Sequence, residues 1–188
     1  MTTTPLSILF TGHMVDLPDR ATPRFPPGLE AAAREEIVSR VRHHVGTRPV
    51  ETVRGFASLA RGGDILFHEI CRSFGIATVI VLPFSPDEFL ATSVKGLDSG
   101  NWPHRFRKLW ETTAPDARLN LGLPISDAAY SACNEQLLKL SQAYGDVQMI
   151  ALWDGSGGDD IGGTGHFVKS ASEASGREPD IIYPKQLS

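Results

Sequence analysis

Residues 77–82 read Ala-Thr-Val-Ile-Val-Leu, a continuous apolar and mostly β-branched run. A strand with one face in water alternates apolar and polar residues, whereas a strand covered on both faces is apolar throughout. Two further runs have the same character, Leu6–Phe10 and Val147–Trp153. These three segments predict the buried strands of a parallel sheet.

Helical periodicity fills the intervals between these runs. One helix is indicated by apolar residues at every fourth position: Leu29, Ala33, Ile37, Val41 and Val45. Gly46 and Pro49 are expected to end this helix. A second helix carries Leu66, Phe67, Ile70, Cys71 and Phe74. Asp64 suits the N-cap of that second helix, and Gly75 would close it.

The remaining elements have weaker patterns. We expect further strands at 51–54, 117–123 and 180–183. A short helix is expected through Phe89, with Ser85 or Asp87 as its cap, and longer helices around 102–110, 130–144 and 167–175. Residues 93–103 are expected to form a loop. Strand and helix alternate throughout. The sequence therefore predicts an α/β, Rossmann-like three-layer domain with a mostly parallel sheet and right-handed crossovers.

Size and charge narrow the class of protein. A chain of 188 residues buries roughly 70% of its surface on folding, which favours one domain over 1–188. The net charge of −4 gives no basic footprint for nucleic acid. The apolar run 76–84 is too short to span a membrane, and the first residues do not resemble a signal peptide. Two cysteines in apolar surroundings indicate reduced thiols, so we expect a cytoplasmic protein.

Unusual segments follow four of the predicted strands: residues 11–13, 55–64, 83–84 and 154–166. Ligands of open parallel sheets bind outside the carboxyl ends of the strands, near the point where strand order reverses. We therefore expect a ligand pocket at this edge. The long proline-rich loop 13–28 is expected at the same edge of the sheet. Arg20 and Arg24 in this loop could bind a phosphate through paired hydrogen bonds.

The segment from Asp154 to His166 holds six glycines between residues 155 and 165. Gly162, Gly163, Thr164 and Gly165 precede an expected helix, where backbone N–H groups can approach a phosphate. No lysine follows as in a P-loop. The alternative is a glycine loop without a ligand. Asp154, Asp159 and Asp160 suggest a divalent cation, but their spacing misses the EF-hand pattern, so these carboxylates are expected to be solvated and no metal is expected.

Gly62, Gly63 and Asp64 form a second candidate site, with backbone donors at a helix start. Because a carboxylate repels phosphate, Asp64 suits a ribose or base contact; the alternative is a plain helix cap. Gly12 and His13 after the first strand, with Asp154 and His166, complete the candidate ligand-binding residues. No Ser/His/Asp or Cys/His arrangement is recognisable, so catalytic residues stay unassigned. The aromatic residues Trp102, Phe106 and Trp110 are expected in the core rather than as a base-stacking platform.

Several segments together resemble the SLOG superfamily, the Rossmann-like domains related to the DNA-processing protein and the LOG phosphoribohydrolases. They are 11–13 (TGH), 57–64 (ASLARGGD) and 162–165 (GGTG). The strings 10–16 (FTGHMVD), 23–26 (PRFP), 82–84 (LPF) and 153–155 (WDG) resemble the branch that accompanies nucleotide-cyclase and signalling modules. The likeness covers nearly the whole chain.

The resemblance implies a module that binds or senses a nucleotide-derived, ribose-phosphate-containing ligand of the ADP-ribose type, without a cofactor. The LOG enzymes carry a glutamate in the helix after P-G-G-x-G-T, whereas here Ile161 replaces the proline and residues 166–170 contain no acid. Phosphoribohydrolase activity with altered catalytic residues is therefore the alternative. The partners this implies are the ligand, an effector or cyclase-type protein, and a second copy of the chain.

Overall fold

The computed structural model describes residues 4–156 and 163–188. Its strands are β1 (Leu6–Gly12), β2 (Val53–Ala57), β3 (Ala77–Leu82), β4 (Arg118–Asn120), β5 (Asp146–Leu152) and β6 (Asp180–Ile182). They form one six-stranded sheet in the order β4-β3-β2-β1-β5-β6, in which every pair is parallel. The predicted Rossmann-like α/β fold is confirmed.

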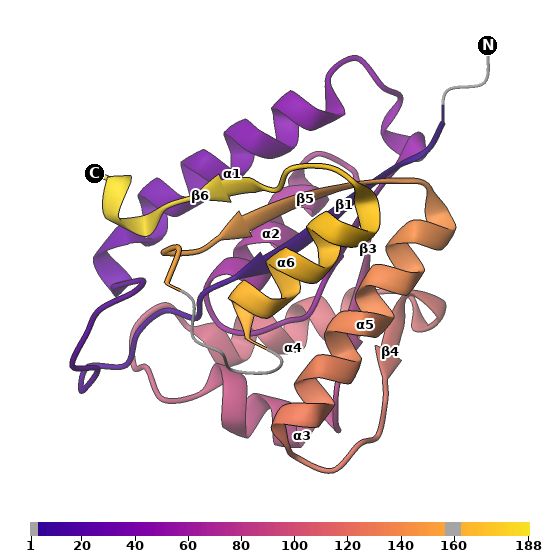
Figure 1. Cartoon of the computed structure of the whole chain (residues 1–188). Helices are drawn as coiled ribbons and strands as arrows, with labels where there is room; N and C mark the ends of the chain where they lie inside the picture. Colours follow the sequence, from indigo (N-terminus) through magenta and orange to yellow (C-terminus); the bar gives the residue numbers. More distant parts are fainter. Residues whose placement is uncertain (1–3, 157–162) are drawn as a thin grey trace.

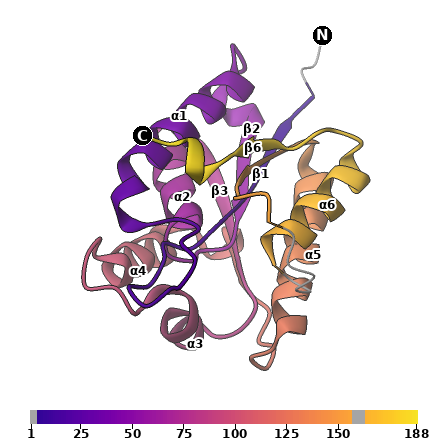
Figure 2. The same cartoon turned by 60° about the vertical axis from the view of Figure 1, so that its left-hand side comes forward.

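Helices cover both faces of this sheet. They are α1 (Glu30–Val45), α2 (Gly63–Ser73), α3 (Pro86–Phe89), α4 (Trp102–Thr112), α5 (Asp127–Tyr144) and α6 (Thr164–Ser175). Figure 2 shows the sheet between two layers, with α1 and α2 on one side and α5 and α6 on the other. One apolar cluster lies under α1 and α2 and a second under α5 and α6, which is the arrangement of a three-layer domain.

The apolar runs occupy the places that their composition predicts. Every residue of Leu6–Phe10 is buried, and so are the last four residues of β3. The aromatic residues of α4 belong to the core as expected, since Trp102 and Phe106 are buried and Trp110 packs against them at the margin. Ser85 caps α3 through a capping box with Glu88, one of the two caps that the sequence allows.

Four local predictions need correction. The loop expected at 93–103 covers only 95–101, because a π-helical turn extends over Leu90–Val94 and α4 begins at Trp102. The strand expected at 51–54 is β2, Val53–Ala57, and a 3₁₀ turn at Val50–Thr52 precedes it. The strand expected at 117–123 is shorter: β4 covers only Arg118–Asn120, at the edge of the sheet, and a 3₁₀ turn at Pro115–Ala117 precedes it. Asp64 is not the N-cap of α2: Gly62 takes that position, and the Asp64 carboxylate instead accepts the N–H of Ala60 at 3.1 Å.

The strand order places the candidate site. The chain runs from β1 outward to β4 on one side and then returns to β5 and β6 on the other, so the order reverses between β1 and β5. The loops after β1, β2 and β5 therefore meet at one edge. In Figure 1 the loop after β1 lies below the arrowheads of β1 and β5, at the lower left.

Within the described ranges, none of the helices combines the length and the apolar composition needed to cross a membrane.

Candidate functional site

The loops after β1 and β2 are held together by their backbones. Gly63 N donates to His13 O at 3.2 Å, and Met14 forms an antiparallel bridge with Gly62. A Cβ atom at Gly12 would stand 3.0 Å from Gly63 Cα, a distance tighter than ordinary contact. The two glycines thus allow the end of β1 to approach the start of α2, and this approach forms the floor of the site.

Two adjoining cavities open above this floor. The small cavity, of about 190 Å³, lies between α5, α2 and the start of α6; its walls include Phe10, Ser58, Asp64, Phe89, Ser93, Tyr130, Cys133, Asn134, Leu137 and Phe167. The charged cavity, of about 540 Å³, lies under the loop after β1; its walls include His13, Val15, Asp16, Leu17, Asp19, Arg20, Arg24 and Arg61. Both are also lined by Gly12, Met14, Thr92, Gly163 and Thr164, which form a shared neck.

The small cavity combines apolar walls with polar groups. Ser93 Oγ and Tyr130 Oη are hydrogen-bonded at 3.0 Å, which links the turn after α3 to α5. Ser58 Oγ is buried and has no hydrogen-bond partner among the described residues. Aromatic walls with a few convergent polar groups are typical of a pocket for a small ring system.

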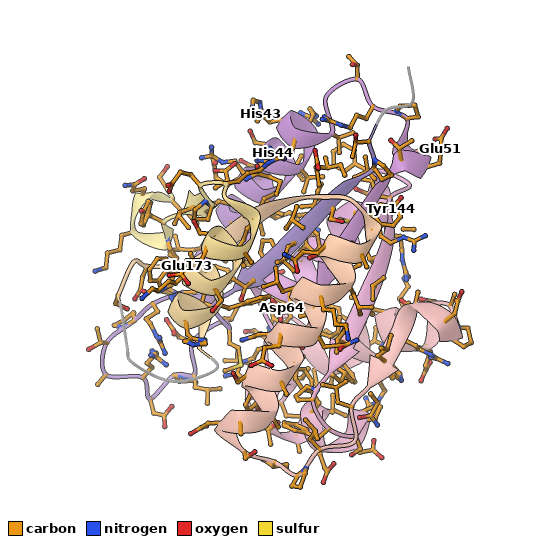
Figure 3. All side chains as sticks on the ribbon, turned by 45° about the vertical axis from the view of Figure 1, so that its right-hand side comes forward. His43, His44, Glu51, Asp64, Tyr144 and Glu173 are labelled. Atoms are coloured by element: carbon orange, nitrogen blue, oxygen red, sulfur yellow. The ribbon has the colours of Figure 1, made fainter. Side chains whose placement is uncertain are left out.

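Asp64 lies inside the fold, behind α5 in the view of Figure 3, with only 6% of its surface exposed. Burial raises its pKa to about 7, although hydrogen bonds from the backbone of Ala60 and Gly12 oppose the shift. In the described part of the chain it forms no ion pair within 4.0 Å. Because Gly12 belongs to the neck, Asp64 stands beside the junction of the two cavities.

The Asp64→Asn variant is expected to change how stability depends on pH. Between about pH 4 and pH 7 the folded protein keeps the Asp64 proton and the unfolded chain, with a pKa near 3.8, has lost it. The free energy of unfolding of the wild type should therefore fall by a few kcal/mol, relative to the variant, as pH rises through this window. Urea denaturation of both proteins at each pH measures the difference.

The comparison with a variant is needed because titration of His68 changes the pH dependence of stability in the direction opposite to that of Asp64. Burial lowers the pKa of His68 to about 4, so its contribution to stability rises between about pH 4 and pH 6.5. That contribution is common to the wild type and Asp64→Asn and cancels in the difference. The exposed Asp98→Asn is a matched control that should follow the wild type. Parallel curves for the wild type and Asp64→Asn would contradict the assignment.

The charged cavity carries three guanidinium groups and two carboxylates. Asp16 is already engaged, because it accepts the backbone N–H groups of Arg24 and Phe25 at 2.7 Å and pairs with Arg20 Nε at 3.2 Å. The Arg24 side chain forms no ion pair with any described residue. Three positive against two negative side chains leave an excess of one positive charge, which the start of α6 increases.

Arg61 is a lining residue that the sequence interpretation missed. Only 5% of its surface is exposed. Its Nε donates to Val15 O at 3.0 Å and its Nη1 to Lys95 O at 3.1 Å, while its backbone N–H donates to Ser93 O. Nothing in the sequence around Arg61 distinguishes it from a surface arginine, because its burial depends on the distant segments 13–17 and 93–96.

His13 and Asp154 meet across the ends of β1 and β5. His13 Nε2 lies 3.0 Å from Asp154 Oδ1 and 3.1 Å from Asp154 N. Burial lowers the pKa of His13 despite the opposing effect of Asp154. Although burial works against it, hydrogen bonds from Ser156 and His13 lower the pKa of Asp154 to about 2. The pair therefore joins an imidazole that lines the charged cavity to a carboxylate that is not among the residues lining it.

The structure brings together part of the predicted site. Gly12, Gly163 and Thr164 line both cavities, Asp64 lines the small one, and the charged one is lined by His13, Arg20 and Arg24. Gly62 and Gly63 lie beneath them as supports.

Other predicted residues lie apart from the cavities. Gly165 faces the ring of Trp153, and the exposed His166 lines a separate hollow between α5 and α6. Gly162, Asp159 and Asp160 lie outside the described residues. Among the described residues, no group of three or more His, Cys, Asp or Glu side chains could hold a metal ion.

Comparison of the chain with protein-family models, curated proteins and solved structures gives no significant match.

Proposed function

We propose that this chain is a SLOG-type domain that binds a nucleotide-derived ligand, with a ring in the small cavity, phosphate in the charged cavity and ribose at the neck. The observation that supports this most strongly is the contrast between two cavities that share a neck. One has aromatic walls and the other has an excess of positive charge. A ligand with an uncharged ring and an anionic end matches this contrast.

The sizes of the cavities agree with the proposal. An apolar cavity of about 150 Å³ can hold benzene, so the small cavity, at about 190 Å³, is on the scale of a ring system. The charged cavity, at about 540 Å³, has room for a phosphate group and part of a sugar. Asp64, beside the neck in the wall of the small cavity, is a hydrogen-bond acceptor for ribose hydroxyls. A role as a sensor that acts on an effector or cyclase-type protein is supported by the sequence resemblance alone.

Thermal denaturation with a panel of ligands tests the proposal. AMP and ADP-ribose should raise the melting temperature more than adenosine or ribose 5-phosphate, because only the complete ligands occupy both cavities. A ligand present at 100 times its Kd stabilises the fold by about 2.7 kcal/mol, which corresponds to a shift of about 5–10 °C for a chain of this size. Melting temperatures with inosine monophosphate and cytidine monophosphate show whether the protein distinguishes between bases. Equal shifts with AMP and adenosine would contradict phosphate recognition.

A phosphoribohydrolase is the second candidate, and the position of Asp64 favours it. A buried, protonated carboxyl group beside the neck could give its proton to the departing base. The C1′–N bond would break, water would bond to C1′, and the proton of that water would return to the Asp64 carboxylate. Chromatography of the AMP samples decides between the two: adenine release that Asp64→Asn abolishes supports the enzyme, and unchanged AMP supports the binding module.

A further inference from the structure

Arg61 holds a buried positive charge whose partners within the described chain are neutral. Its side chain donates to the carbonyl oxygens of Val15 and Lys95, and no carboxylate of the described residues lies within 4.0 Å. The Asp16 carboxylate attracts the Arg61 charge from a greater distance. It already pairs with Arg20 Nε and accepts the backbone N–H groups of Arg24 and Phe25. A buried charge without a counterion is unfavourable, so such a group gains more from an anion than an exposed arginine does.

The hydrogen bonds of Arg61 also hold it in place. Two segments hold it. Val15 O, in the loop after β1, accepts from Nε; in the segment 93–95, Lys95 O accepts from Nη1 and Ser93 O accepts from the backbone N–H of Arg61. A guanidinium group has five N–H donors, and these carbonyls use one on Nε and one on Nη1. The other three have no acceptor among the described residues, and the side chain lines the charged cavity. Arg61 is thus a fixed donor with unused hydrogen-bonding capacity.

The start of α6 lines the same cavity through Gly163 and Thr164. The first N–H groups of a helix have no partner within the helix and favour an anion. A phosphate ester carries a charge of about −1.5 to −2 and three acceptor oxygens, whereas a carboxylate has a single charge and two oxygens. Donors that reach the cavity from Arg61, from α6 and from the loop arginines suit the phosphate better.

We infer that Arg61 is the central phosphate ligand of this site, with Arg20 and Arg24 at its periphery. The inference deepens the proposed function and relies on it for the identity of the molecule that carries the phosphate. Arg20 and Arg24 lie on the loop after β1, where Arg20 is exposed and bonded to Asp16. They contribute long-range attraction, while the rigid Arg61 contributes short, directed hydrogen bonds.

Arg61→Gln tests the inference, with Arg24→Gln as the matched control. Calorimetric titration should show AMP affinity about 10- to 100-fold weaker for Arg61→Gln, as for the loss of hydrogen bonds to a charged group. Adenosine affinity should stay within about twofold, and Arg24→Gln should weaken AMP binding less than Arg61→Gln. Equal losses of AMP and adenosine affinity would show a merely structural role, and unchanged AMP affinity would also overturn the inference.

Two further measurements keep the test decisive. If Arg61→Gln does not fold by circular dichroism, Arg61→Lys keeps the charge without the planar fork, and its AMP affinity should lie below that of the wild type with adenosine affinity retained. If no nucleotide binds the wild type, the proposed function fails, yet inorganic phosphate still tests Arg61. Phosphate should then raise the melting temperature of the wild type and not that of the variant; the same shift in both, or none in either, would refute the inference.

Discussion

Gly163→Val is expected to weaken AMP binding by well over tenfold, or more than about 1.4 kcal/mol, while leaving the fold intact. Gly163 is the N-cap of α6 and lines both cavities, so a side chain there takes space in or beside the neck. Its φ of −73° and ψ of 169° are open to any residue, so the substitution adds bulk without backbone strain. Calorimetric titration with AMP measures the loss.

A matched control is available at Gly28. It lies in the 3₁₀ turn Pro27–Leu29 between β1 and α1, has nothing within 4 Å of its ideal Cβ position, and has no left-handed backbone angle. Gly28→Val should therefore bind AMP like the wild type and melt at nearly the same temperature. If Gly163→Val also binds AMP like the wild type, the phosphate does not lie at the start of α6 and the site assignment is wrong.

Gly62→Ala is expected to destabilise the protein by about 3 kcal/mol or more. The residue has a φ of +97°, which an L-residue rarely adopts, and the added Cβ would stand 2.7 Å from Val15 N and 2.9 Å from His13 O. Both neighbours are backbone atoms of the adjoining loop and cannot rotate away. Strain of this kind and overpacking each contribute about 1–3 kcal/mol. Guanidinium denaturation gives the free energy of unfolding.

Gly176 separates these two contributions. Its φ of +65° is also left-handed, yet nothing lies within 4 Å of its ideal Cβ position. Gly176→Ala should therefore lose only about 1–2 kcal/mol, the strain of the left-handed region. A loss from Gly62→Ala no greater than that from Gly176→Ala would mean that the loops after β1 and β2 separate at little cost, and the floor of the site would not be rigid.

Much of the fold follows from residues that act locally. The runs in β1, β3 and β5 are apolar on both faces, and the repeat from Leu29 to Val45 faces one side of a helix, so composition alone indicates their burial. The edge strand β4 was least predictable, because its three residues are only half-buried or exposed and resemble a loop. The π-helical turn at Leu90–Val94, which directly continues α3, was not predicted.

The position of the two cavities was predictable, but the identity of their lining residues was not. Glycines after β1 and before α6 indicated the edge at which the cavities lie, because parallel strands end together. Arg61 and Tyr130 gave no signal, since their exposure depends on segments far away in the chain. Asp64 had the signature of a helix cap, yet the close approach of Gly12 and Gly63 draws it into the interior. Long-range packing therefore determines which polar residues line the cavities.

The most direct test of the two-cavity account is a crystal structure of the wild type grown with millimolar AMP. The account predicts the adenine ring in the small cavity between Phe89 and Phe167, the ribose beside Asp64, and the phosphate within hydrogen-bond distance of Arg61 and of the first N–H groups of α6. AMP bound elsewhere, or with its ring in the charged cavity and its phosphate in solvent, would contradict it.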